Sequence, residues 1–153
     1  ETNPRNGLVP DNTRENAPAS MTAIGLGLAT YPVAVERGYI SRAEAAASVL
    51  TTLQFFWNSP QGEAADASGY KGFYYHFLDI ETGRRVWNCE LSTIDSTYFL
   101  AGALAAAAYF NQNTPVEAEI RTTADALYLR VDWQWAMNGG RRFRMDGDRS
   151  RVF

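Results

Sequence analysis

Apolar residues recur at helical spacing in the first third of the chain and predict two helices. Residues 19–37 show one such stripe, with Pro18 suited to the first turn and Gly38 suited to the C-terminal end. Ser41 and Glu44 have the spacing of a capping box, which opens a second helix. The apolar stripe of this second helix consists of Val49, Leu50, Leu53, Phe56 and Trp57.

Two more helices are predicted in the second half of the chain. The third runs from about Ser92 to Phe110 and carries small residues on nearly all sides, so it should be buried against several neighbours. The fourth begins at Thr114 and is expected to continue through Trp135 until Gly139-Gly140 ends it.

The segment between these helical halves follows strand spacing instead. Residues 72–79 alternate weakly and are aromatic, Glu81-Thr82-Gly83 supplies a turn, and residues 84–88 can return as a partner strand. We therefore predict a short β-hairpin over residues 72–88. Paired helices with one inserted hairpin indicate an all-α protein, either a helical bundle or part of an (α/α) toroid.

Composition and charge exclude several kinds of protein. The chain has 153 residues, 46% of them hydrophobic, and its net charge of −3 argues against a nucleic-acid partner. Residues 1–17 are expected to form an extended lead-in, residues 18–138 a helical domain, and residues 139–153, which are rich in arginine, a basic tail. No apolar run reaches the ~18 residues of a membrane span. Cys89 is the only cysteine, so no internal disulfide is expected.

One stretch combines the residue types that a sugar site needs. Residues 72–95 contain a run of aromatics, the only histidine and four carboxylates. Aromatic rings stack on pyranose faces, while carboxylates bond sugar hydroxyls and move protons. His76 has neither a second histidine nor a thiol pair to share a metal with, so no metal site is expected. No cofactor-binding motif is present either.

Five blocks of sequence, in this order, resemble the glucoamylase-like (glycoamylase) domain family. The blocks are Ile-Gly-Leu-Gly-Leu-Ala (24–29), Val-Glu-Arg-Gly-Tyr-Ile (35–40), Gly-Phe-Tyr-Tyr-His-Phe-Leu-Asp (72–79), Glu-Leu-Ser-Thr-Ile-Asp-Ser (90–96) and Arg-Val-Asp-Trp-Gln-Trp (130–135). The family includes bacterial endo-β-1,2-glucanases and a domain of cyclic β-1,2-glucan synthases. The chain is much shorter than the family's domains and looks like their N-terminal part.

The resemblance implies an (α/α)6 toroid that hydrolyses an oligo- or polysaccharide, a β-glucan with β-1,2 linkages, with inversion. It also implies a location in the periplasm or outside the cell. An incomplete ring would leave an apolar stripe on the second or fourth helix facing water, so the chain is expected to self-associate and to be inactive as a monomer. The alternative is a non-catalytic helical fragment that binds carbohydrate or a protein partner.

Glu90 and Asp95 are the candidate catalytic residues. Inverting glycosidases use two carboxyl groups about 6.5–9.5 Å apart. A separation of five residues across a loop-to-helix junction can give that distance. Asp95 has a competing interpretation, because Ser92 and Asp95 also have the spacing of a capping box. Glu90 has no capping role available.

Four further residues are candidates for substrate binding. His76 could donate to a sugar hydroxyl or be a half-buried structural histidine. Tyr75 belongs to the aromatic run 73–77, of which one alternating pair should pack on helices and the other could line a cleft. Asp79 could bond hydroxyls, although opening the turn is the favoured interpretation. Glu36 either faces the cleft, as the family block suggests, or forms an exposed salt bridge of little weight.

Overall fold

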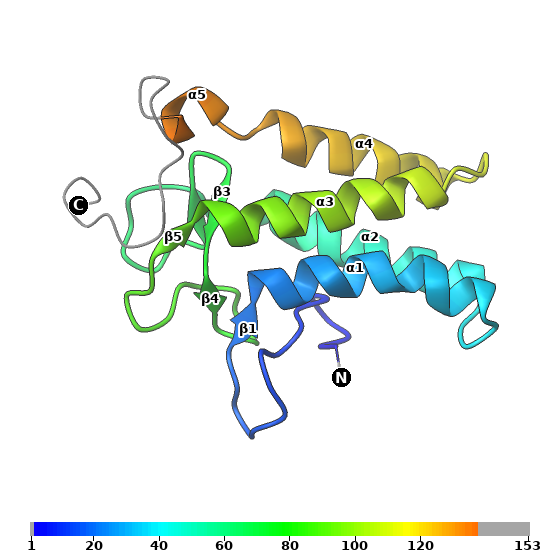
Figure 1. Ribbon diagram of the computed structural model, residues 1–153, viewed down its shortest axis with the longest axis horizontal. Helices are drawn as coiled ribbons and strands as arrows, with labels where there is room; N and C mark the ends of the chain where they lie inside the picture. Colours follow the sequence, from blue (N-terminus) through cyan, green and yellow to red (C-terminus); the bar gives the residue numbers. More distant parts are fainter. Residues whose placement is uncertain (1, 138–153) are drawn as a thin grey trace.

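Four long helices lie side by side, with short strands gathered at one end of them (Figure 1). The computed structural model describes residues 2–137. The helices are α1 (Met21–Glu36), α2 (Arg42–Asn58), α3 (Thr93–Tyr109), α4 (Pro115–Leu129) and the short α5 (Trp133–Ala136). α1 packs on α3, α3 on α4, α4 on α2 and α2 on α1, so the helical pairs enclose a common core. No helix in this part of the chain is long and apolar enough to cross a membrane.

Polar side chains at three helix starts explain why these helices begin where they do. The Ser41 hydroxyl accepts from the Glu44 amide, and the Glu44 carboxylate accepts from the Ser41 amide, so the predicted capping box is confirmed. Thr114 caps α4 with Pro115 in its first turn. The third helix also follows the prediction, because Ser92 caps it and it ends at Tyr109.

The first helix starts two residues later than predicted. Ala19 and Ser20 form strand β1 (Ala19–Ser20), and the helix begins at Met21 because Ser20 is extended and paired with a neighbouring strand. Its predicted end is confirmed. Gly38 has a φ of +71°, a left-handed conformation that favours glycine, and its amide donates to the Val35 carbonyl.

The fourth helix is shorter than predicted. α4 ends at Leu129, and the continuous helix expected through Trp135 is replaced by a break followed by α5. The break forms because Asp132 caps a new helical turn, accepting from the Trp135 amide at 2.9 Å, while its own amide donates to the Lys71 carbonyl. The expected stop at Gly139-Gly140 and the tail 139–153 lie outside the described residues.

The strands form two small antiparallel sheets. β1 pairs with β4 (Phe77–Leu78). In the other sheet, β3 (Phe73–Tyr75) lies between β2 (Gly69–Tyr70) and β5 (Leu91–Ser92). Helices therefore account for about half of the described residues and are joined by strands, which corrects the all-α prediction. The extended residues before α1 and α3 form strands because their backbone groups hydrogen-bond to β4 and β3, respectively.

The predicted hairpin over residues 72–88 is only partly correct. Leu78 and Arg85 form an isolated antiparallel bridge across the turn. β3, however, takes its partners from β2 and β5 and not from the returning segment. That segment cannot continue as a strand, because Trp87 and Asn88 have φ values of +55° and +52°.

Both faces of β3 are covered, so its side chains do not alternate between core and cleft. Phe73 and Tyr74 are fully buried and Tyr75 is 5% exposed, which corrects the predicted alternation. Tyr74 packs edge-on against Phe56 of α2 and Phe99 of α3, with ring centroids 4.9 and 5.5 Å apart. The strand is thereby fixed to two helices at once.

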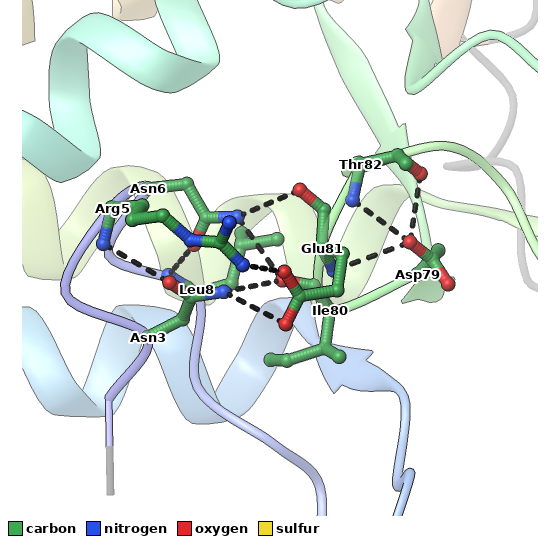
Figure 2. Close-up of polar contacts among 8 residues, drawn as sticks. All are labelled: Asn3, Arg5, Asn6, Leu8, Asp79, Ile80, Glu81 and Thr82. Atoms are coloured by element: carbon green, nitrogen blue, oxygen red, sulfur yellow. Dashed lines mark hydrogen bonds and ion pairs between the residues drawn. The ribbon is translucent and has the colours of Figure 1, made fainter.

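The lead-in is held against the turn that follows β4 (Figure 2). The side-chain amides of Asn3 and Asn6 both donate to the Ile80 carbonyl at 3.0 Å, and Arg5 pairs with Glu81. Leu8 follows and is fully buried, so this segment contributes to the core. The docked lead-in braces the end of the molecule where the strands lie.

Candidate functional site

His76 lies between two carboxylates at the strand end of the molecule. Its Nδ1 is 2.7 Å from Oε1 of Glu90, and its Nε2 is 3.8 Å from Oδ2 of Asp95. The side chains of His76 and Glu90 are 29% and 37% exposed, whereas that of Asp95 is 11% exposed. The sequence separates these residues by up to nineteen positions, and the fold brings all three together.

Backbone hydrogen bonds fix the position of His76. Its amide donates to the Glu90 carbonyl at 3.0 Å, and its carbonyl accepts from the amide of Met21, the first residue of α1, at 3.2 Å. Its ring stacks on Phe77, with centroids 3.9 Å apart and planes 14° from parallel. Both sheets and the start of α1 therefore determine where the imidazole lies.

Asp95 is held by hydroxyl groups from two helix starts. Thr22, in the first turn of α1, donates to one carboxylate oxygen, and Ser92 donates to the other. The Asp95 amide donates in turn to the Ser92 hydroxyl at 3.1 Å, which caps α3. The capping interpretation and the site interpretation of this segment thus both describe real contacts, made by different groups of the same residue.

Glu90 is ionised more readily than an ordinary glutamate. Partial burial by itself raises the pKa of Glu90, but hydrogen bonds from its own amide and from His76, together with the charge on His76, outweigh that effect. The resulting pKa lies below the ordinary value of 4.5. The N-terminal ends of α1 and α3 also lie at this cluster, and helix N-termini favour negative charge.

This arrangement is suited to moving protons. An imidazole can donate a proton from one ring nitrogen and accept one at the other, and here each nitrogen faces a carboxylate. General acid–base catalysis needs such groups within reach of solvent and substrate. The partly exposed side chains of His76 and Glu90 meet that condition.

Among residues 2–137, no group of three or more histidine, cysteine, aspartate or glutamate side chains could hold a metal ion. Two surface hollows of about 400 Å³ each lie elsewhere. One is lined by residues of α2 and the lead-in, and the other lies between the lead-in and α1. Neither of these hollows includes His76, Glu90 or Asp95 among its lining residues.

The chain is similar to enzymes named for their action on β-1,2-glucans. It is 30% identical over 142 residues to an exo β-1,2-glucooligosaccharide sophorohydrolase of Parabacteroides distasonis, matching 86% of this chain and 18% of that relative. No protein-family model matches the sequence.

Solved structures share the fold. A glucoamylase-like protein of Bacteroides uniformis superposes with a TM-score of 0.84 at 22% identity, covering 99% of this chain and 36% of that one. A β-1,2-glucanase of P. distasonis gives 0.80 at 23% identity, covering 97% and 21%. The endo-β-1,2-glucanase of Chitinophaga pinensis, in complex with sophorotriose and glucose, gives 0.75 at 22% identity, covering 90% and 34%.

The predicted resemblance is confirmed. The chain has the fold of a part of the glucoamylase-like proteins and β-1,2-glucanases. It spans 18% of the curated relative and between 21% and 36% of these solved chains.

Within this glucoamylase-like fold, three predicted substrate-binding residues lie outside the His76 cluster. Asp79 fixes the turn, because its Oδ1 accepts from the amides of Glu81 and Thr82 and from the Thr82 hydroxyl. Tyr75 is buried, and the guanidinium of Arg85 lies 4.1 Å from the centre of its ring.

Glu36 lies at the opposite end of α1 from the cluster. Thr22 contacts Asp95 at the start of this helix, whereas Glu36 is its last residue and accepts from the Tyr109 hydroxyl at 2.7 Å. A helix rises 1.5 Å per residue, so the two ends are roughly 20 Å apart. Glu36 is therefore not brought together with the other candidates.

Sequence reasoning missed Thr22. Its hydroxyl contacts Asp95 across 73 residues of chain, and nothing in its local pattern distinguishes it from any helical threonine. Only the packing of α1 on α3 brings the Thr22 hydroxyl to the Asp95 carboxylate.

Proposed function

We propose that this chain contributes part of the active site of a glycoside hydrolase acting on a β-glucan with β-1,2 linkages. The observation that carries the proposal is the cluster in which the partly exposed His76 and Glu90 meet the buried Asp95. The names of the sophorohydrolase and of the two glucanases support the same substrate class.

The proposed mechanism is inverting hydrolysis by an acid and a base. One carboxyl group protonates the leaving oxygen and the other activates water. The lowered pKa of Glu90 suits the base, which has to be ionised to accept a proton from water. Asp95 supplies the second carboxyl group, and the imidazole of His76 lies between the two carboxyl groups, with its Nε2 3.8 Å from Asp95.

Glu90→Gln tests this assignment. In a full-length protein that contains this segment, we expect the release of reducing sugar from linear β-1,2-glucan to fall about 10²–10⁴-fold, because the amide cannot accept the proton of water. Asp125→Asn, which changes an exposed carboxylate on α4, is the matched control and should leave the rate unchanged. Following the anomeric configuration of the first product by NMR tests inversion directly. Hydrolysis by the Glu90→Gln variant at the wild-type rate would remove Glu90 from the mechanism.

A second candidate function is binding of carbohydrate or of a protein partner without catalysis. The observation that favours it is a set of exposed apolar side chains on α1 and α3, which include Leu26, Val33, Ile94 and Tyr98. Calorimetry distinguishes the two functions. If a β-1,2-gluco-oligosaccharide gives a heat of binding that returns to the baseline after each injection, and no shorter sugars are formed, the chain is a binding module.

We also propose that the protein meets its substrate in the periplasm or outside the cell. A polymeric glucan does not cross a lipid bilayer unaided, so an enzyme that cuts it has to be exported to reach an external polymer. Immunodetection in cytoplasmic, periplasmic and culture fractions of the source cells is the test, and recovery only with the cytoplasm would contradict this location.

A further inference from the structure

Trp87 exposes most of its indole to solvent beside the His76 cluster. Its exposed fraction is 73%, the highest of the tryptophans among the described residues. Trp57 is 45% exposed and lies under the guanidinium of Arg130, whereas Trp133 and Trp135 pack against the core. Aromatic side chains usually stabilise a fold because their rings are removed from water. Trp87 contributes little stability in this way, since most of its ring is exposed.

The backbone at Trp87 is held in a conformation that tryptophan rarely adopts. Trp87 and Asn88 both have left-handed φ values, +55° and +52°, and the Cys89 amide donates to the Val86 carbonyl at 3.1 Å. Two successive left-handed residues closed by such a bond make a turn that favours asparagine and glycine. A bulky residue at the first of these positions is strained, and strain of this kind is often kept where it serves a site.

Contacts on both sides of the turn keep it in place. The Cys89 thiol donates to the Phe77 carbonyl at 3.3 Å and accepts from the Phe77 amide at 3.4 Å. Arg85 Nε donates to the Cys89 carbonyl at 2.7 Å. The backbone of the turn is thus fastened to β4.

The indole belongs to the same row of rings as His76. Trp87 and Phe77 have centroids 5.7 Å apart, and Phe77 stacks on the imidazole. Glu90 follows Trp87 by three residues and contacts the other edge of His76. A pyranose ring lying on the indole would therefore lie at the same end of the molecule as the carboxylate and imidazole, with Phe77 in contact with both the indole and the imidazole.

We propose that Trp87 is a stacking platform for one glucose unit of the substrate, adjacent to the His76 cluster. This inference rests on the proposed function. Flat aromatic surfaces suit the apolar faces of β-linked glucose, and polar groups beside the ring fix its orientation.

Trp87→Asn tests the platform without risk to the fold, because asparagine adopts the left-handed conformation readily. We expect the affinity for a β-1,2-linked gluco-oligosaccharide, measured by calorimetry, to fall about tenfold or more, as for the loss of one aromatic contact. Trp87→Phe keeps a ring and should lose less. Tyr39→Ala removes an aromatic that is 83% exposed at the opposite end of α1 and should bind like the wild type.

Fluorescence gives a second readout that does not depend on activity. The bound oligosaccharide should protect the wild-type protein from quenching by acrylamide, and Trp87→Asn should abolish that protection while its melting temperature stays equal or rises. If wild type binds the oligosaccharide and Trp87→Asn binds it equally well, the platform is refuted and the proposed function stands. If the wild type binds none, both are refuted.

Discussion

At the scale of single residues, the cluster depends on carboxylates that do more than their local sequence suggests. Asp95 lies in the first turn of α3, where a carboxylate also has the spacing of a capping residue. Its oxygens accept from the hydroxyls of Thr22 and Ser92, and one of them faces His76. A residue with an ordinary local role thereby becomes a member of a site through contacts that local sequence does not encode.

The ionisation of Glu90 makes a prediction about pH. Its pKa is lower in the folded chain than the ordinary value of 4.5, so ionised Glu90 stabilises the fold fully above that pH. This contribution is lost as the pH falls through the lowered pKa. We therefore expect Glu90→Gln to be less stable than the wild type at pH 6, and the difference to shrink as the pH approaches 3. Urea unfolding across this range measures it.

Asp125→Asn serves again as the control, since the carboxylate it replaces is exposed on α4. Its stability should follow that of the wild type at every pH. A gap between wild type and Glu90→Gln that stays constant or widens on acidification would contradict the lowered pKa.

At the scale of elements, α1 and α3 touch through their backbones. A Cβ placed at Gly102 would lie 2.0 Å from the Gly25 carbonyl oxygen, and one at Gly25 would lie 2.4 Å from the Tyr98 carbonyl oxygen. Glycine at these two positions lets the helices approach closely enough for the Thr22 hydroxyl to reach Asp95. The site therefore depends on two glycines that carry no chemistry of their own.

Gly102→Ala should separate the two helices. We expect the free energy of unfolding to fall by about 1–3 kcal/mol, because the added methyl group meets backbone that cannot move aside. Sugar binding should weaken as well, since α1 would carry Thr22 away from Asp95. Chemical denaturation and calorimetry measure the two effects.

Gly27→Ala provides the comparison on α1. A Cβ there meets only a methyl group of Val9, at 3.3 Å, and alanine favours a helix more than glycine does. This variant should be as stable as the wild type or more so. Equal stability of the Gly102→Ala and Gly27→Ala variants would show that the close approach of α1 and α3 is unimportant.

At the scale of the whole molecule, α1 and α3 present apolar side chains to solvent. The prediction of an exposed stripe on the second or fourth helix is wrong, because α2 and α4 pack on each other and bury residues such as Leu53 and Ile120. Leu26 and Val33 on α1 are 55% and 58% exposed, and Ile94 and Tyr98 on α3 are 58% and 50% exposed. α1 has no charged residue before Glu36, and Asp95 is the only charged residue of α3. Exposed apolar patches without charge become interfaces in most soluble proteins.

We expect the chain to self-associate through this surface. The apparent mass from light scattering should rise with concentration for the wild type. Leu26→Lys combined with Val33→Lys should hold the chain as a monomer, because a charge in an apolar interface loses its hydration without gaining a partner. Leu129→Lys alters a residue that is 78% exposed on α4 and should behave like the wild type. A wild-type monomer at high concentration would contradict this expectation.

The sequence by itself determined the features that depend on neighbours along the chain. Helix starts at Ser41, Ser92 and Thr114 follow from side chains that reach backbone amides three residues away. The end of α1 at Gly38 follows from the left-handed conformation that glycine adopts freely. The residue types over 72–95 also indicated Glu90, Asp95 and His76 as candidate site residues before their geometry was known.

Tertiary structure decided everything that depends on contacts across the chain. Strand pairing was predicted within 72–88, but β3 pairs with residues on both sides of that segment, because the residue that supplies a backbone partner need not be near in sequence. The candidate site residues are divided for the same reason, because contacts between distant segments decide which of them meet. His76, Glu90 and Asp95 meet at the starts of α1 and α3, whereas Glu36 lies a full helix length away. Periodicity specifies which face of a helix is buried, but only packing specifies which helix ends meet.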